Sequence, residues 1–132
     1  MTRYLIDTAV LLWNAGLTER LGPRVREVLR TSADPVFVSS ATSWEIAIKV
    51  ASGKLRLPEP VREFLPRRVG GAGFLSLPIT HEHALTAGEL PPHHADPFDR
   101  MLIAQAQTEG MVLITADRRI TQYAVKTLWA GK

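Results

Sequence analysis

The chain has 132 residues, of which 45% are hydrophobic and 22% are charged. These are the proportions of an ordinary globular protein, so disordered, fibrous and low-complexity classes are excluded, and we expect one domain over residues 1–132. The absence of cysteine excludes a disulfide scaffold, a zinc ribbon, an iron–sulfur centre and a thiol nucleophile. The formal net charge of +3 is by itself weak evidence for an acidic partner.

The apolar stretches of the chain are too short for a membrane protein. The longest, such as Ala9–Trp13, fall far below the roughly 20 residues that span a bilayer. The N-terminus reaches Asp7 before a signal-peptide core forms. We therefore expect a cytoplasmic protein with no membrane partner.

Strand and helix patterns alternate through the first half of the chain. A strand over Arg3–Ile6 stops at Asp7, and a helical pattern follows at once. Pro23 occupies the first position of a second helix, whose outer face is basic. A short strand over Val36–Val38 leads to Ser39 or Ser40 as the cap of a third helix, which ends near Gly53. The expected buried stripe of this helix is Trp44, Ala47, Ile48 and Ala51.

The second half contains shorter elements, because seven of the nine prolines fall between Pro58 and Pro97. A helix from Val61 is expected to stop at Pro66. The remaining predicted elements are a strand over Phe74–Leu77, a helix capped by Thr80 through Gly88, a helix from Pro97 to Gly110, a strand over Met111–Ile114, a helical turn over Arg118–Tyr123 and an edge strand over Thr127–Trp129. This alternation predicts an α/β fold, a three-layer α/β/α sandwich with a central parallel sheet, in which ligands bind at the carboxyl ends of the strands.

Acidic side chains stand at two of these strand ends. Asp7 follows the first strand directly, and Asp117 lies three residues after Ile114. Since parallel strands end at the same edge, the two carboxylates are predicted to converge. The alternative, that each Asp only caps the helix that follows it, stays open.

Glu45 lies early in the third helix, which starts at the same edge. A functional role is weighed against two structural ones. Glu45 and Lys49 are spaced for a surface ion pair, and Thr42 with Glu45 fits a capping box.

Asp96 and Asp99 open the helix that begins at Pro97. Asp96 precedes the proline and is typical of an N-cap, whereas Asp99 is the better candidate for a metal ligand, with Asp96 in support.

Several like charges at one edge require either raised pKa values or bound cations. A carboxylate set without cysteine suits Mg²⁺ or Mn²⁺. Outside the five acids, the other eight acids are outnumbered by 16 basic residues, a distribution that favours a polyanion such as nucleic acid.

Other polar and aromatic residues carry less weight. His81 and His83 are expected on the surface, and His93 or His94 either approaches a substrate phosphate or is solvated. Trp13, Trp44 and Trp129 are expected in the core or an interface, and Gly70–Gly73 is expected to be a flexible loop.

Four segments, in order along nearly the whole chain, resemble the PIN-domain toxins of the VapC type. They are Leu5–Trp13, Ser43–Ile46 with Lys49 and Gly53–Leu55, Asp96–Ala106, and Leu113–Asp117. The resemblance implies a metal-dependent endoribonuclease, the toxin of a toxin–antitoxin pair, with RNA as substrate, an antitoxin as partner and a homodimer as assembly. It matches Asp7, Glu45, Asp99 and Asp117 to the four family acids, Asp96 to an accessory acid and Thr115 to a hydroxyl that orients the site.

The expected mechanism is hydrolysis of an RNA phosphodiester, with Asp7 and Asp99 holding Mg²⁺, or Mn²⁺, while Glu45 and Asp117 complete the metal shell or position water. Arg100, Arg118 and Arg119 are the candidate RNA contacts. A receiver-type phosphoacceptor domain fails, because only one acid follows the first strand; a non-catalytic PIN-fold RNA-binding or regulatory module remains the alternative.

A docking groove is expected at the helices Thr8–Asn14 and Pro23–Thr31. The helices and the residues near them hold more apolar surface than one sheet face covers, including Leu11, Leu12, Trp13 and Leu17. VapC-like toxins are similar in receiving an amphipathic antitoxin helix in such a groove.

Overall fold

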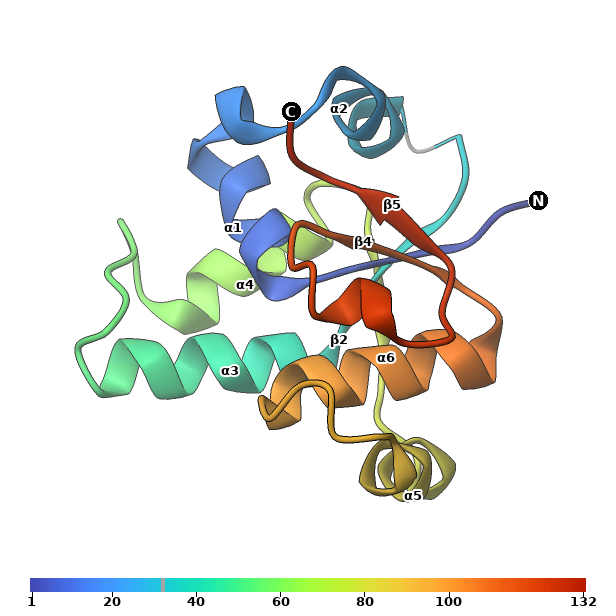
Figure 1. Ribbon diagram of the computed structural model, residues 1–132. Helices are drawn as coiled ribbons and strands as arrows, with labels where there is room; N and C mark the ends of the chain where they lie inside the picture. Colours follow the sequence, from blue (N-terminus) through green and yellow to red (C-terminus); the bar gives the residue numbers. More distant parts are fainter. Residues whose placement is uncertain (32) are drawn as a thin grey trace.

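The computed structural model describes residues 1–31 and 33–132, and its centre is a five-stranded sheet (Figure 1). All strand pairs are parallel, in the order β3-β2-β1-β4-β5. The strands are β1 (Tyr4–Ile6), β2 (Val36–Ser39), β3 (Leu75–Leu77), β4 (Val112–Thr115) and β5 (Thr127–Trp129). The predicted parallel sheet, with Thr127–Trp129 at an edge, is confirmed.

Helices cover both faces of this sheet (Figure 1). One apolar cluster joins it to α1 (Thr8–Gly16), α2 (Pro23–Thr31) and α3 (Ser40–Ala51), with α4 (Val61–Val69) packed against them. The opposite cluster contains α6 (Pro97–Glu109) and the short turn η2 (Ile120–Gln122), and α5 (His81–Glu89) packs against α6. A further short turn, η1 (Thr18–Arg20), links α1 to α2. The three-layer α/β/α sandwich is therefore confirmed.

The central strands are buried on both sides. Leu5 packs in the cluster with α6, while its neighbour Ile6 packs in the cluster with α1 and α2, because successive strand residues point to opposite faces. Ile6 is in register with Ile114, so β1 and β4 end side by side. This register determines where the acids at the two strand ends come to lie. Among the described residues, no helix has the length and apolar character needed to cross a membrane.

Local capping signals fix the helix ends as predicted. Ser39 caps α3 and Thr80 caps α5 through their side-chain oxygens, and Asp96 does the same for α6. Gly110 ends α6 with φ of 68°, a left-handed conformation that favours glycine.

The expected buried stripe of α3 is wrong. Trp44 is 63% exposed and Ile48 is 42% exposed, and Ala47 and Ala51 are also exposed. The buried residues of α3 are Ala41, Thr42, Glu45 and Ile46. This inward face includes polar residues because it borders a polar cleft, so hydrophobicity does not mark the buried side of this helix.

Helix α4 does not stop at Pro66 but continues to Val69. Proline removes one backbone donor from the helix, and Pro66 lies on the exposed side of the helix. The apolar contacts that Val61, Leu65 and Val69 make with the core therefore extend on both sides of the proline.

The expected surface position of His83 is also wrong, whereas His81 is exposed. His83 is buried, with Nε2 2.8 Å from Glu109 Oε2. Its Nδ1 accepts the backbone N–H of Thr80, which completes a capping box at the start of α5. A histidine used in this way is buried because both ring nitrogens have protein partners.

Candidate metal centre

The ends of β1 and β4 bring Asp7 and Asp117 to one edge of the sheet. The backbone N–H of Asp7 donates to the carbonyl of Ile114 at 3.0 Å, which ties the two strand ends together. Asp7 is buried, and its Oδ1 accepts the N–H of Val10 at 2.9 Å, so it also caps α1. Asp7 therefore caps α1 and also lies at the sheet edge where the site is expected, so the two interpretations do not exclude each other.

Glu45 reaches the same place from α3. Lys49 Nζ donates to Glu45 Oε2 at 2.7 Å, but the pair is not a surface pair, because the Glu45 side chain is only 6% exposed. Its Oε1 is buried and has no hydrogen-bond partner within the described part of the chain. The capping box with Thr42 is wrong: α3 already begins at Ser40, and the Thr42 hydroxyl accepts from Thr8 at 3.0 Å.

Asp96 and Asp99 lie at the start of α6. Asp96 Oδ1 accepts the backbone N–H groups of Phe98 at 2.8 Å and of Asp99 at 3.1 Å. Asp96 is thus the N-cap that the sequence predicts, and Asp99 projects from the first turn of the helix that it caps.

These elements meet in a cleft of about 400 Å³. Its lining includes all five acids, namely Asp7, Glu45, Asp96, Asp99 and Asp117. Lys49 and Arg118 border the same cleft, and Leu12 and Trp13 of α1 form an apolar wall. The structure therefore brings together every acid that the sequence places at this edge.

Burial and mutual repulsion make ionisation costly for two of the acids. Burial raises the pKa of Asp7 to about 6, and the neighbouring Asp99 and Asp117 add to this shift against hydrogen bonds from Thr115 and Val10. Burial and the charge of Asp96 raise the pKa of Asp99 to about 6, against the effect of His94. A cation in the cleft would relieve both penalties.

Asp117 behaves differently because Arg119 is its partner. Burial alone would raise the pKa of Asp117, but side-chain and backbone hydrogen bonds from Arg119 lower it below the ordinary value. Arg119 Nη2 donates to Asp117 Oδ2 at 3.0 Å. The buried Thr115 hydroxyl accepts the backbone N–H of Asp117 at 3.0 Å, so Thr115 fixes the turn that carries this acid.

His94 is a residue of this site to which the sequence assigned no definite role. It is buried, and its Nε2 lies 2.7 Å from Asp99 Oδ2 and 3.2 Å from Asp117 Oδ2. One atom each of His94, Asp99 and Asp117 lie within 4.8 Å of one another. The sequence does show that His94 lies two residues before Asp96, the N-cap of α6. This short spacing keeps His94 close to the acids at the start of that helix.

The three candidate arginines occupy different environments. Arg100 donates to the backbone carbonyls of Pro91, Ala87 and Leu90, each within 3.0 Å, so it holds the loop before α6. Arg118 is exposed and stacks over the Trp129 ring at 5.0 Å. Arg119 is exposed and paired with Asp117. Only Arg118 and Arg119 are placed to meet a ligand from outside.

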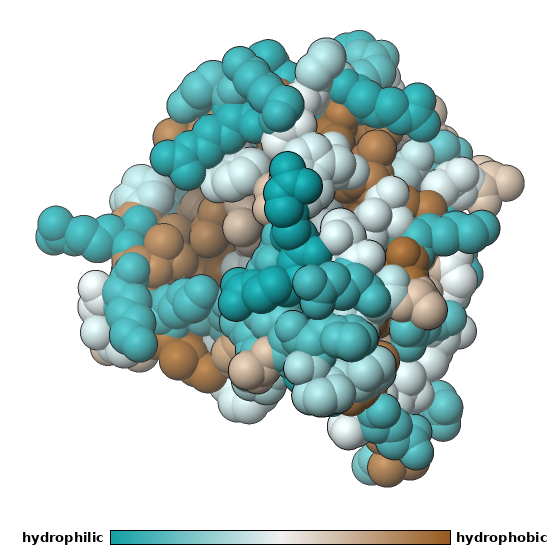
Figure 2. Space-filling model, in the orientation of Figure 1, coloured by the Kyte–Doolittle hydropathy of each residue, from teal (hydrophilic) through white to brown (hydrophobic). Residues whose placement is uncertain are grey.

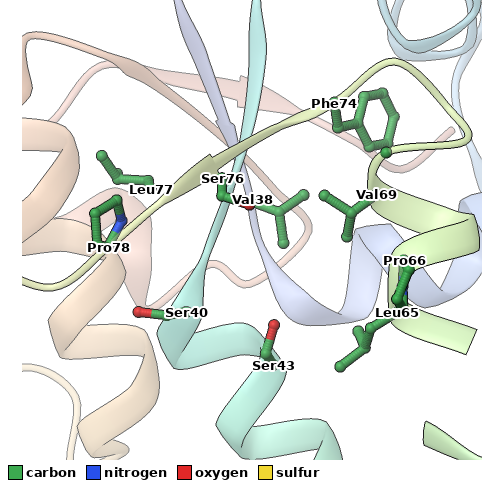
Figure 3. A pocket seen from close by; sticks show the side chains of 11 residues that line it. Val38, Ser40, Ser43, Leu65, Pro66, Val69, Phe74, Ser76, Leu77 and Pro78 are labelled. Atoms are coloured by element: carbon green, nitrogen blue, oxygen red, sulfur yellow. The ribbon is translucent and has the colours of Figure 1, made fainter. Parts of the chain in front are cut away.

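A second cavity, of about 560 Å³, lies between α4, β3 and the start of α3 (Figure 3). Its lining is mostly apolar, with Val38, Val69 and Phe74 on its walls and the Ser40 and Ser43 hydroxyls nearby. It contains no acidic side chain. The candidate metal centre is therefore confined to the cleft with the five acids.

The carboxylate oxygens that line this cleft are suitable ligands for a hard divalent cation. Carboxylate oxygens are the ligands that Mg²⁺ and Mn²⁺ prefer. Glu45 Oε1 is a buried acceptor with no donor among the described residues, an arrangement that costs free energy unless something positive binds there.

Comparisons with known proteins agree with this fold. The PIN domain model matches residues 4–126. The chain is 29% identical over 124 residues to "Ribonuclease VapC22" of Mycobacterium tuberculosis, covering 93% of each chain. Its fold is similar to VapBC2 from Rickettsia felis bound to a promoter DNA fragment, with a TM-score of 0.68, 11% identity and 98% and 99% of the two chains covered. It is also similar to DNA-bound VapBC from Salmonella typhimurium, with a TM-score of 0.67, 17% identity and 97% and 98% covered. The chain belongs to the PIN domain family.

Proposed function

We propose that this protein is a metal-dependent endoribonuclease and the toxin of a toxin–antitoxin pair. The observation that carries the proposal is the convergence of five acids in one cleft, with a buried Glu45 oxygen that has no partner in the described chain. The likeness to a ribonuclease of the VapC type over 93% of both chains supports the activity and the substrate. The VapBC structural neighbours support an antitoxin partner.

The proposed cofactor is Mg²⁺, with Mn²⁺ as a substitute. Asp7 and Asp99 would hold it directly, and Glu45 and Asp117 would complete its shell or position the attacking water. When bound, such a cation lowers the pKa of water and stabilises negative charge on the phosphodiester.

The protein's own contribution is to fix these groups in advance. Asp7 is held by the N–H of Val10 and Asp99 by the helix start that Asp96 caps. Thr115 holds the turn of Asp117. Attack by water on the phosphodiester leaves a 5′-phosphate and a 3′-hydroxyl. Side chains that are already ordered need no reorganisation when the substrate arrives.

Arg118 and Arg119 are the proposed contacts to the RNA backbone. Both are exposed beside Asp117, and Arg118 lines the acid cleft. Arginine suits phosphate because its guanidinium donates two parallel hydrogen bonds. Arg100 is left out of this set, because its guanidinium is occupied by backbone carbonyls.

The proposed antitoxin site is the apolar surface of α1 beside the acids. Leu11 of the expected groove is fully in the core, but Leu12 and Trp13 line the cleft and Leu17 is exposed. Figure 2 shows hydrophobic surface in the region of α1, at the left of the view, bordered by hydrophilic side chains. An amphipathic helix lying there would carry a basic side chain to the acids, where it would replace the cation.

The proposed homodimer uses the outer face of α3. Trp44 and Ile48 are exposed there on one side of the helix, and Trp44 also contacts Phe98 edge-on at 5.4 Å between ring centroids. Exposed large apolar residues that line up on a helix are typical of an association surface.

The test is RNA cleavage by the purified protein with no added metal, with Mg²⁺ and with Mn²⁺. We expect cleavage that EDTA abolishes and that leaves 5′-phosphate ends. RNA binding without cleavage under all three conditions would refute the enzyme and support a non-catalytic RNA-binding module.

A further inference from the structure

We propose that His94 is a positioning residue of this site, whose Nε2–H bonds Asp99 and Asp117 together and fixes the spacing of their carboxylates. The inference rests on the proposed function and names a residue outside the acid set. The two acids come from different parts of the fold, Asp99 from the start of α6 and Asp117 from the turn after β4. His94 Nε2 lies within hydrogen-bond distance of both acids.

The position of the imidazole supports this role. His94 is only 4% exposed, and its Nε2 lies 2.7 Å from Asp99 Oδ2 and 3.2 Å from Asp117 Oδ2. Two carboxylates this close to one atom repel each other unless a donor or a cation lies between them. A buried imidazole N–H supplies that donor without occupying the open side of the cleft.

The second ring nitrogen identifies which atom carries the proton. The backbone N–H of Asp96 donates to His94 Nδ1 at 3.3 Å, so Nδ1 is an acceptor. In the neutral ring the proton then belongs to Nε2, which donates to the acids. A histidine that bound the metal through Nε2 would carry its proton on Nδ1 and would oppose the Asp96 N–H with a second donor. The geometry therefore favours a donor over a metal ligand.

The loop that carries His94 is held on two sides. The hydroxyl of Tyr123 accepts the backbone N–H of His94 at 2.9 Å and donates to the carbonyl of Pro91 at 2.7 Å. Arg100 Nη1 donates to Pro91 at 3.0 Å and to the His94 carbonyl at 3.4 Å. The backbone is thus fixed before the ring enters the cleft. The role of Arg100 in the site is therefore to hold the loop that carries His94.

Asp117 Oδ2 contacts Arg119 as well as His94. Arg119 is exposed and donates to Asp117 Oδ1 and Oδ2 from the solvent side. The Arg119 backbone N–H also donates to Asp117 Oδ1 at 2.9 Å, whereas the buried His94 contacts Oδ2. The bond from His94 ends on Oδ2 of each acid and does not use Asp99 Oδ1, which stays available to a cation.

The test compares His94→Leu with His94→Gln, and uses His93→Leu as the matched control. Leucine fills similar volume without a donor, whereas the glutamine amide keeps a donor near the Nε2 position. His93 is the exposed neighbour of His94, and its ring contacts Tyr123 edge-on rather than any of the five acids in the described part of the chain. Circular dichroism first establishes that all three variants are folded.

The main readout is metal binding by calorimetry with Mn²⁺ and with Mg²⁺, in the absence of RNA. We expect His94→Leu to weaken binding about 10- to 100-fold, as loss of a group that orients metal ligands does. His94→Gln should stay within a few-fold of the wild type, and His93→Leu should equal it. At saturating metal, His94→Leu should lower kcat for RNA cleavage and leave KM unchanged. Pulsed electron paramagnetic resonance of bound Mn²⁺ should show no coupling to a coordinated nitrogen.

Three results would overturn the inference. Unchanged metal affinity in His94→Leu would show that the donor is unnecessary. Equal losses in His94→Gln and His94→Leu would show that the ring acts by shape alone, and nitrogen coupling would make His94 a ligand. A wild-type protein that binds no divalent metal and cleaves no RNA would instead refute the proposed function itself.

Discussion

Asp96 fixes the acid that follows it on α6, because its Oδ1 accepts the backbone N–H of Asp99 at 3.1 Å. The same oxygen accepts the N–H of Phe98 at 2.8 Å. One carboxylate therefore ends the loop and defines the helix start from which the other projects into the cleft. Asp96 is therefore the residue that positions the helix start, and Asp99 is the residue that would bind the metal.

Substitutions of Asp96 distinguish these roles. Serine is a good N-cap, so Asp96→Ser should keep most of the metal-dependent cleavage, whereas Asp96→Ala should lower the free energy of unfolding by about 1 kcal/mol. Chemical denaturation and cleavage assays on the same preparations measure both effects. If the folded serine variant is inactive, Asp96 belongs to the metal shell.

Removing the charge of Asp7 or Asp99 should separate activity from stability. Asp7→Asn and Asp99→Asn should each abolish EDTA-sensitive RNA cleavage. The metal-free variants should be as stable as the wild type or more so, because each removes a costly buried charge, and asparagine still caps α1 at position 7. Thermal unfolding in EDTA gives the comparison. Full cleavage activity in both variants would refute the assignment of the metal site.

The raised pKa of Asp7 predicts a pH dependence for the metal-free protein. Burial raises this pKa from 3.8 to about 6, so the carboxyl stays protonated to a higher pH in the folded state than in the unfolded state. Its contribution to stability is complete below pH 3.8 and is lost as the pH rises through about 6. The stability of Asp7→Asn relative to the wild type should therefore grow across this window and level off above it. A constant difference from pH 4 to pH 8 would contradict the shift.

The proposed antitoxin site predicts competition with metal. The C-terminal segment of the cognate antitoxin alone should block RNA cleavage, and excess Mg²⁺ should partly relieve the block, because a basic side chain and the cation compete for the same acids. A scrambled segment of equal charge is the control. Tight binding of the segment to a fully active ribonuclease would show that inhibition does not occur by occupation of the acidic cleft.

The outer face of α3 predicts the assembly. Ile48→Glu should convert a dimer into a monomer in light scattering after size-exclusion chromatography, because a charge on this face opposes burial of the apolar surface. Leu75→Glu, an equally drastic change at an exposed residue of the edge strand β3, should leave the dimer intact. A dimer in both variants would place the interface elsewhere.

The sequence by itself determined the features that depend on neighbours along the chain. The strand that ends at Asp7, the cap at Asp96 before Pro97 and the left-handed Gly110 each follow from local geometry, so their elements begin and end close to where they were predicted. The alternation of these elements was enough to predict a parallel sheet and hence the convergence of Asp7 and Asp117. Each of these signals is contained in a few adjacent residues.

Only the tertiary structure decided which side chains are buried and what they contact. Apolar spacing on α3 pointed to Trp44 and Ile48, yet the helix turns Thr42 and Glu45 inward, because α1 and the acid cleft lie on that side. His94 and Arg100 are polar residues whose roles depend on partners contributed by other elements, including Asp117 and the carbonyl of Ala87. The free energy of burying a polar group is set by the partners it finds, and those partners become neighbours only when the chain folds.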